Sequence, residues 1–182
     1  MTEEKNKLVS IAAVVLTLPL KVSRLPERGT TVLGSAERPG VGESAEVMMA
    51  AARQGVKVVN MSCLGTGPNS TQARQVLREA NIETRTVEVV GDIGMKIQMI
   101  EEGGYYASVL TTGVEIDISA RELDKASMHP GDVVYISAGD LAHTSYRAAL
   151  SQWLPSLPEQ VKVVMAATPQ ISQIEPQYVS EV

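Results

Sequence analysis

A loop in the first third of the sequence places carboxylates beside a glycine, just before a helical pattern begins. The segment RPGVGESAEVMMAAARQG, residues 38–55, contains Gly42 followed by Glu43, Ser44 and Glu46. A glycine loop that opens onto a helix brings backbone N–H groups close to a small ligand, and those groups favour an anion. Carboxylate side chains repel an anion. The loop therefore has the frame of a binding loop with an unexpected charge.

The other residues that could do chemistry are few. His129 lies in MHPGD and His143 in LAHTS, without the Cys pair or the Glu at ligand spacing that a metal site needs, so we expect a turn and a helix start there. Ser137 and Ser145 lie near His143, but the Gly-x-Ser-x-Gly elbow of a hydrolase is absent from the sequence. Cys63 ends the apolar run VKVVNMSC and is expected to be a buried strand thiol.

Three further side chains have two possible roles each. Asp140 follows DVVYISAG and either caps a helix or faces the crevice beyond the strand ends, where open α/β sheets bind ligands; we favour capping. Tyr105 and Tyr106 follow a pair of glycines and cover either a ligand or a partner protein. Adjacent strand residues point to opposite faces, which favours partner packing for this pair.

Strand and helix patterns alternate in the first part of the chain. Residues 8–22 are rich in β-branched side chains and predict one long strand. Helical periodicity begins near Ser44 and stops at Gly55, and Asn69 with Gln72 forms a plausible capping box for a second helix after the strand VKVVNMSC. This order predicts parallel strands joined by crossover helices.

The middle of the chain, residues 84–115, has no helical stripe. Its apolar segments TRTVEVV, GMKIQMIEE and YYASVLTTGVE are separated by Gly91 and by the pair Gly103 and Gly104. Such spacing is typical of an antiparallel meander. We expect this meander to stand apart from the parallel sheet as a flap or lid.

The parallel pattern resumes after the meander. Ser119 and Glu122 form a second capping box, and the helical segment HTSYRAALSQWL is followed by the strand VKVVMAAT. One stripe of that helix holds Tyr146, Ala149, Leu150 and Trp153. The segment after residue 168 reads as a loop and a helical turn. Without a further strand, one edge and part of both sheet faces would stay uncovered.

Length and charge limit the function classes. A chain of 182 residues with 44% apolar residues suits one domain, residues 1–182. The formal net charge is −5 and basic residues are scattered, which argues against nucleic-acid or membrane partners. The N-terminus lacks the basic region of a secretory signal, and the longest apolar run is too short for a membrane span. We expect a cytoplasmic protein.

Four segments carry a resemblance to a known family. They are RLPERGTTVLGS, GVGESAEVMMAAARQGVKV, SCLGTGPNSTQARQVLREANIET and GYYASVLTTGVEIDISARELD. In this order they resemble the N-terminal half of the ribokinase or phosphofructokinase-B (PfkB) family of sugar and nucleoside kinases. The first is similar to the family's Leu-Pro-x-x-Gly-Glu-Thr segment, the second to its Gly-Gly-x-Gly-x-Asn loop, and the third to its Gly-Asp-Asp turn and helix. The fourth keeps the family's glycine, at Gly113. The resemblance covers essentially the whole chain.

The resemblance implies an architecture. It is an α/β ribokinase-like (Rossmann-like) sandwich, with a mostly parallel sheet, flanking helices and a small antiparallel β lid. The lid corresponds to about residues 14–36 and 84–115 of a single truncated domain. In the family a sugar lies between lid and main sheet, and dimers often form lid against lid. The resemblance therefore implies a sugar-like ligand and a homodimer.

The resemblance also assigns sugar-site positions, and most differ here. The family's Asn-x-Asp falls on Val15 and Thr17, and its loop Asn on Glu46, whereas Gly42 and Gly113 are kept. By motif position the substrate-binding residues are Thr17, Gly42, Glu46 and Gly113.

Two further family positions are altered. Thr66 and Gly67 replace an acidic pair, and Ala138 stands about where a polar strand-end residue is often acidic. Because paired hydrogen bonds make hydroxyl recognition specific, we expect a scaffold without ordinary sugar affinity, or else a different ligand.

The family's catalytic apparatus has no counterpart in this sequence. An Asp base in a Gly-Ala-Gly-Asp-like anion loop and the nucleotide pocket belong to the family's C-terminal half, and no Walker loop replaces them. We therefore expect no catalytic residue, metal site or cofactor in this chain, with ATP and Mg needed only by a complete family member. The expected function is the N-terminal substrate and lid portion of a ribokinase-like sugar kinase that does not phosphorylate by itself. The alternative is a non-catalytic ribokinase-like binding or oligomerisation module.

Overall fold

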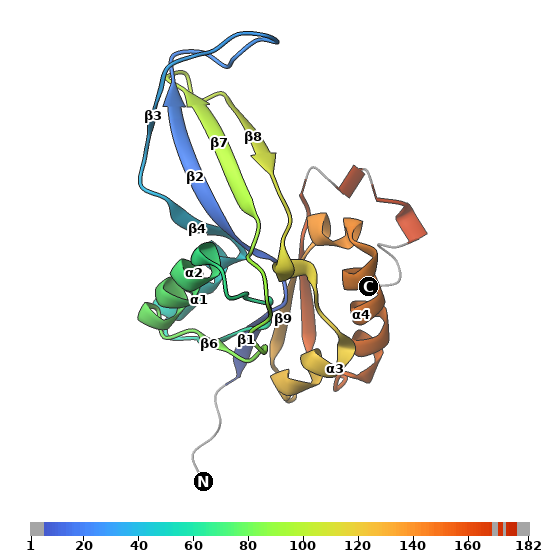
Figure 1. The fold of residues 1–182 in the computed structure, drawn as a ribbon. Coiled ribbons are helices and arrows are strands. Elements are labelled where there is room, and N and C mark those ends of the chain that lie inside the picture. Colours follow the sequence, from blue (N-terminus) through green and yellow to red (C-terminus); the bar gives the residue numbers. More distant parts are fainter. Residues whose placement is uncertain (1–5, 169–170, 173, 178–182) are drawn as a thin grey trace.

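A five-stranded parallel sheet forms the body of the protein (Figure 1). The computed structural model describes residues 6–168, 171–172 and 174–177. The strand order is β10, β9, β1, β5, β6. The bounds are Lys7–Ser10 for β1, Lys57–Asn60 for β5, Glu83–Thr84 for β6, Val133–Ser137 for β9 and Lys162–Ala166 for β10. Val9 of β1 lies opposite Val59 of β5 and Val134 of β9. The predicted parallel sheet with crossover helices is confirmed.

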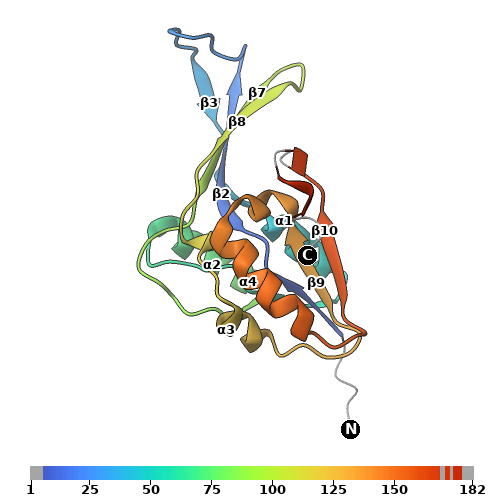
Figure 2. The same ribbon diagram turned by 90° about the vertical axis from the view of Figure 1, so that its right-hand side faces the viewer.

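A second sheet stands away from the body as an upright blade (Figures 1 and 2). We call it the lid sheet. Its strands are β2 (Val14–Val22), β3 (Gly34–Ala36), β4 (Gly40–Glu43), β7 (Met95–Glu101) and β8 (Tyr106–Leu110). β2 pairs with β7 in parallel and with β3 and β4 in antiparallel fashion, and β7 pairs with β8 as an antiparallel hairpin. The sheet is therefore mixed.

Two sequence predictions about strands are wrong. The expected single strand over residues 8–22 divides into β1 and β2, because Ile11 to Ala13 leave the main sheet and enter the lid sheet. These three linking residues are buried, so their apolar character did not distinguish them from strand residues. The expected meander is also reduced to the β7–β8 hairpin. Residues 85–94 contain no strand, and the bridge from Gly65 to Val89 is their only recorded sheet pairing.

Helices cover both faces of the main sheet (Figure 2). The bounds are Ser44–Arg53 for α1, Pro68–Glu79 for α2, Ala120–Leu123 for α3 and Thr144–Trp153 for α4. Strand residues alternate between two cores. Val9 and Val59 pack in the core that contains α4, and Val58 packs in the core that contains Met48 of α1 and Leu77 of α2. The predicted α4 stripe is confirmed, because all its members are buried.

The two predicted capping boxes have different outcomes. Ser119 caps α3, and its hydroxyl accepts a hydrogen bond from the Glu122 backbone N–H at 3.3 Å, as predicted. The box at Asn69 is wrong, because α2 begins at Pro68 with Gly67 at the N-cap and no side-chain cap from that residue. The distant carboxylate of Asp92 accepts the free N–H groups there instead, from the Asn69 and Ser70 backbones at 3.0 and 2.7 Å.

The β10 edge of the main sheet is open in the part of the chain that the structure describes. Val163 and Val164, which point to opposite faces, are 41% and 49% exposed. The uncovered edge and faces expected from the sequence are therefore present. The expected loop and helical turn after residue 168 lie partly outside the described residues. Across the described ranges, no helix combines the length and apolar character needed to cross a bilayer.

Candidate functional site

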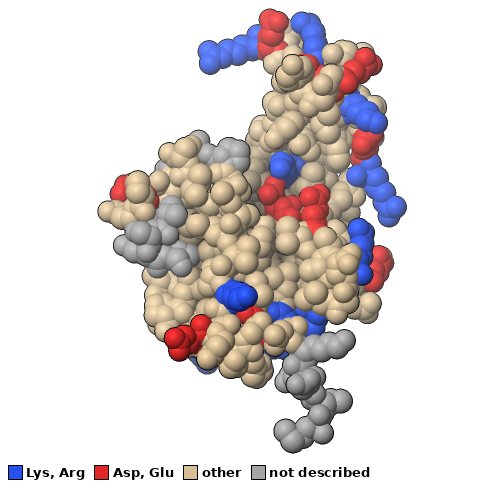
Figure 3. Space-filling view, turned by 180° about the vertical axis from the view of Figure 1, so that it is seen from behind, with Lys and Arg blue, Asp and Glu red and all other residues tan. Residues whose placement is uncertain are grey.

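A cleft of about 290 Å³ lies between the lid sheet and the carboxyl ends of the parallel strands. Its floor is formed by the residues that follow β1 and β9 and by the end of β10: Ala12, Ala13, Ser137, Gly139, Asp140, Ala166 and Thr168. Its walls come from the α1 start and from β7 and β8. Seen from behind, acidic and basic atoms gather in the hollow between the lid strands and the body (Figure 3). Open α/β sheets bind ligands at this end.

One face of β8 forms a wall of the cleft. Tyr106, Ser108 and Leu110 line it, whereas Val109, on the other face, is 58% exposed and does not. Tyr106 thus lies at the cleft, and the partner-packing role that the sequence favoured for it stays a prediction. Tyr105 is 75% exposed and does not line the cleft.

The start of α1 brings an acidic side chain to the cleft. Glu43 is the N-cap of α1, with φ of 55°, a region that a non-glycine residue rarely adopts. Its carboxylate forms an ion pair with Lys96 of β7 at 2.8 Å. Ser44 fixes this turn, because its hydroxyl lies 2.7 Å from both the Ala12 and Ala13 carbonyl oxygens and shares its one proton between them. The loop thus presents a carboxylate and an ammonium group side by side.

Asp140 lies on the floor of the cleft, in the 3-10 turn Ala138–Ala142 after β9. Its Oδ2 accepts a hydrogen bond from the Ala13 backbone N–H at 2.8 Å. Burial raises the pKa of Asp140 to about 6; the bond from Ala13 opposes the rise, and the charges of Glu43 and Glu115 add to it. The capping role favoured from the sequence is wrong, because α4 has His143 at its N-cap and no side-chain cap. Asp140 faces the crevice instead.

Glu115 is a third carboxylate at the cleft and is 1% exposed. Its Oε2 accepts a hydrogen bond from the Gly94 backbone N–H at 2.8 Å, and the Gly113 N–H approaches both of its oxygens at 3.0 Å. These bonds hold the 3-10 turn Val114–Ile116 against the start of β7. Sequence reasoning missed Glu115 and Lys96, although a Glu two residues after the retained Gly113 was a usable signal.

The four positions assigned from the resemblance do not line the cleft. Thr17 and Gly42 are neighbours across β2 and β4, where a Cβ on Gly42 would clash with the Thr17 hydroxyl. Glu46 is exposed on α1. Gly113 lies beside Asp92 and bonds Glu115. Only the first two are brought together, and a binding role for each of the four stays a prediction.

Two other altered positions can be placed. Val15 lines the cleft, so an apolar side chain stands where the resemblance assigns a sugar-binding Asn. At the end of β9, Ala138 is fully buried, and the polar side chains that reach the cleft are Ser137 and Asp140. The acidic group at this strand end is therefore two residues beyond the position that the sequence comparison suggested.

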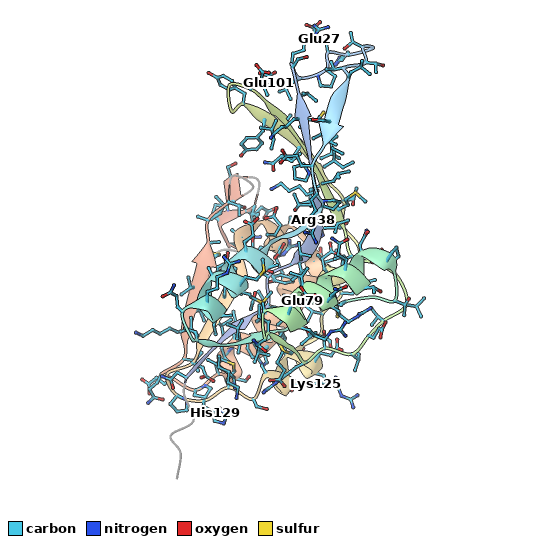
Figure 4. All side chains as sticks on the ribbon, turned by 90° about the vertical axis from the view of Figure 1, so that its left-hand side faces the viewer. Glu27, Arg38, Glu79, Glu101, Lys125 and His129 are labelled. Carbon is cyan, nitrogen blue, oxygen red and sulfur yellow. The ribbon has the colours of Figure 1, made fainter. Side chains whose placement is uncertain are left out.

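Among the residues considered for other chemistry, Ser137 and His143 line the cleft, whereas His129 and Cys63 do not. Within the described ranges, no three His, Cys, Asp or Glu side chains are grouped so that they could hold a metal ion. His129 begins a turn at the base of the body, far from the lid tip where Glu27 and Glu101 lie (Figure 4). Cys63 is buried as predicted but follows β5 rather than belonging to it. Burial raises the pKa of the Cys63 thiol to about 11, so it is a poor nucleophile.

A parallel sheet between helix layers, with a strand lid above its carboxyl ends, defines a ribokinase-like α/β fold. The family model described as pfkB family carbohydrate kinase matches residues 5–180. The chain therefore belongs to the pfkB carbohydrate kinase family. A search of curated proteins finds no match to it.

Solved kinase structures share this fold. A ribokinase from Giardia lamblia superposes with a TM-score of 0.80 at 14% identity, covering 96% of this chain and 59% of that one. A fructokinase from Xylella fastidiosa gives 0.71 at 13% identity, with 97% and 58% covered. A nucleoside kinase from Methanocaldococcus jannaschii gives 0.68 at 14% identity, with 97% and 57% covered. At such identities the likeness shows the fold alone. The chain spans 57–59% of the length of these three structures.

Proposed function

We propose that this chain is the substrate-binding and lid portion of a ribokinase-like sugar kinase. The observation that carries the proposal is the position of the cleft, between the lid sheet and the carboxyl ends of β1, β9 and β10. Ser108, Ser137 and Asp140 line it with groups that hydrogen-bond alcohols. A volume of about 290 Å³ suits a small, sugar-like ligand.

Phosphoryl transfer is assigned to a region of the family fold that this chain does not contain. The chain carries no anion-loop motif, and the solved kinases are longer, with only 57–59% of their length covered. The open edge of β10 supports this division, since Val163 and Val164 are exposed on opposite faces where further elements could pack. ATP, Mg and the catalytic base belong to that region in the proposal. The chain alone, given ATP and a sugar, should yield no phosphorylated product.

The lid sheet is proposed as the surface for a homodimer. Leu33, Tyr105 and Val109 are 92%, 75% and 58% exposed on lid strands or their connections. Apolar side chains gathered on one exposed sheet favour association. Sedimentation of the chain at several concentrations tests this part of the proposal independently of ligand binding. A strictly monomeric species at high concentration would reject it.

The proposed ligand site can be tested by filling the cleft from its wall. Ser108→Trp adds a large side chain on the cleft face of β8, at an exposed position that leaves the core intact. Val109→Trp is the matched control, because it adds the same group to the other face of the same strand. Titration calorimetry with a panel of neutral monosaccharides should detect binding by the unaltered chain and by the control, and loss of binding in Ser108→Trp. Equal binding by both variants would exclude the cleft.

A non-catalytic binding or oligomerisation module is the second candidate. Val15 favours it, since this apolar side chain lines the cleft where the resemblance assigns a hydrogen-bonding Asn. The kinase portion and the non-catalytic module differ in whether the open edge of β10 is expected to pack against a C-terminal half. A kinase portion should gain catalysis when it is covalently joined to, or mixed with, a family C-terminal half. A module should bind its ligand or partner with no such gain.

A further inference from the structure

Acidic side chains outnumber basic ones around the cleft. Glu43, Glu115 and Asp140 line it, and Lys96 is the single Lys or Arg among its described lining residues. Lys96 is paired with Glu43 at 2.8 Å, so it does not neutralise the other two carboxylates. Glu115 receives only backbone N–H groups. The cleft therefore carries an excess of negative charge in a partly enclosed space.

Asp140 is the carboxylate most affected by this excess. One of its oxygens is held by the Ala13 N–H, and the described contacts give it no cationic partner. Burial, together with the charges of Glu43 and Glu115, raises its pKa to about 6, although the bond from Ala13 lowers it. A positive group placed beside Asp140 would relieve this repulsion. An anionic group in the same place would add to it.

A bare metal ion does not fit this arrangement. In the described part of the chain, no three acidic, His or Cys side chains come together as a metal site, although three carboxylates line the cleft. They are spread around a space of about 290 Å³. Hard cations require several oxygen ligands at 2.0–2.6 Å, typical of such sites. A larger organic cation can instead approach separated carboxylates.

An unmatched hydroxyl group at the cleft indicates that the ligand is also polar. Thr168 lines the cleft, and its Oγ1 is shielded from solvent without a hydrogen-bond partner in the described structure. Tyr146 of α4 also has a hydroxyl without a partner there, but it is fully buried and does not line the cleft. Buried polar groups are normally hydrogen-bonded.

We propose that the ligand of this cleft carries a protonated amine as well as hydroxyl groups, as an amino sugar or an amino alcohol does, and that Asp140 holds the ammonium group. Glu115 supplies further negative potential, whereas the charge of Glu43 is offset by its ion pair with Lys96. The inference rests on the proposed function, because it names the ligand class of the same site. It also explains how a loop that carries carboxylates can still bind a ligand. The ligand is a cation rather than the anion that a glycine loop usually binds.

The test compares matched pairs of ligands that differ by one amine. The pairs are D-glucose with D-glucosamine, D-galactose with D-galactosamine, and D-sorbitol with 1-amino-1-deoxy-D-sorbitol. Titration calorimetry at about pH 6.5 keeps both Asp140 and the amines largely charged. We expect at least one amine to bind at least tenfold more tightly than its neutral partner. Asp140→Asn should remove that preference, because it keeps the oxygen that accepts from Ala13 and removes the charge.

Asp124→Asn is the matched control, since Asp124 is exposed and does not line the cleft. It should keep the amine preference, and melting curves establish that both variants fold. Neutral sugars that bind as tightly as their amines would overturn the inference and leave the proposed function standing. Binding of neither member of any pair would overturn both. An amine preference that survives in Asp140→Asn would also overturn the inference.

The pH dependence offers a readout that a structural role of Asp140 would not produce. The alkyl amine of 1-amino-1-deoxy-D-sorbitol stays protonated from pH 5 to 8, so changes in its affinity report on the protein. Affinity should rise between about pH 5 and 7 as Asp140 ionises. Tyr135, His143 and Lys96 also line the cleft and stay the same in both proteins. The difference between the unaltered chain and Asp140→Asn isolates Asp140, and equal profiles would contradict its role.

Discussion

The carboxylate of Asp92 accepts two hydrogen bonds from Ser70, one from its backbone N–H and one from its hydroxyl, each at 2.7 Å. The Asn69 N–H adds a third at 3.0 Å. These groups lie in the first turn of α2, where backbone N–H groups have no partner within the helix. A carboxylate there also interacts favourably with the helix dipole. Asp92 thus joins the loop before β7 to the start of α2.

Replacing Asp92 should destabilise the fold without changing the cleft. Asp92→Ala removes the cap and leaves buried N–H groups unpaired, so we expect the free energy of unfolding to fall by about 2 kcal/mol. Urea denaturation followed by circular dichroism measures the change. Glu79→Ala, at the exposed end of the same helix, is the control and should change stability by less than about 0.5 kcal/mol. Similar losses in both would contradict the capping role.

The pH dependence of stability should have opposite signs at Asp92 and Asp140. Burial alone would raise the pKa of Asp92, but the hydrogen bonds from Ser70, Asn69 and Ile93 hold this pKa below its ordinary value. Its stabilisation is therefore present above about pH 4 and is lost as the pH falls through the lowered pKa. The pKa of Asp140 is raised from 3.8 to about 6, mainly by burial. Its ionisation therefore opposes folding, so stability declines as the pH rises between these values.

The Asp140 effect can be isolated with Asp140→Asn in the absence of ligand. A shift of about two pH units corresponds to at most about 3 kcal/mol at neutral pH. The variant should therefore gain stability relative to the unaltered chain as the pH rises from about 4 to about 6. Chemical denaturation at intervals across that range gives the difference curve. A flat difference would mean that Asp140 titrates alike in the folded and unfolded chain.

Glu43 is expected to lower the stability of the fold while placing a carboxylate at the cleft. Its φ of 55° is costly for a residue with a Cβ, whereas glycine adopts such angles freely. Its half-exposed ion pair with Lys96 contributes less than about 1 kcal/mol. Glu43→Gly should therefore raise the unfolding free energy by about 1 kcal/mol and weaken amine binding. Glu46→Gly, in the first turn of α1, is the contrasting variant and should lower stability by about 1 kcal/mol. Destabilisation by both would show that Glu43 is not strained.

A charged side chain should be tolerated on the open edge strand β10 but not on the adjacent strand β9. Val163 and Val134 lie opposite each other on β10 and β9, but Val163 is 41% exposed and Val134 is fully buried. Val163→Lys should change stability by less than about 0.5 kcal/mol and reduce self-association, because charge blunts an exposed strand edge. Val134→Lys should prevent folding or lower stability by more than about 4 kcal/mol. Light scattering and thermal melting measure both. A large loss in Val163→Lys would mean that this edge is covered.

Local patterns predicted the helices better than the connections between sheets. α1 and α4 follow from apolar periodicity, and the Ser119 cap follows from a residue three positions away. The α2 cap was missed because Asp92 is 22 residues beyond Ser70 in sequence. The break between β1 and β2 was missed because a buried link and a buried strand have the same composition. Burial is a tertiary property that spacing does not reveal.

The candidate site was predicted in outline and missed in detail. The acidic loop around Glu43 and the crevice position considered for Asp140 were visible in the sequence. Lys96, the ion-pair partner of Glu43, is 53 residues away and lies on a strand that pairs in parallel with β2. The ion pair between Glu43 and Lys96 therefore depends on the pairing of β2 with β4 and β7, which the sequence pattern does not show. Family motif positions directed attention to Glu46, which is exposed, whereas the fold turns Glu43 toward the cleft.

The short link from Ile11 to Ala13 joins the main sheet to a long strand of the lid sheet. β2 extends nine residues beyond this link, which is about 30 Å at the usual rise of a strand. A rotation of about 10° at the link therefore displaces the tip of the blade by about 5 Å, while β1 stays fixed in the main sheet. Ala13 is the last residue of the link, and its N–H donates a hydrogen bond to Asp140. A change of charge on that one carboxylate therefore acts at the base of the lid sheet.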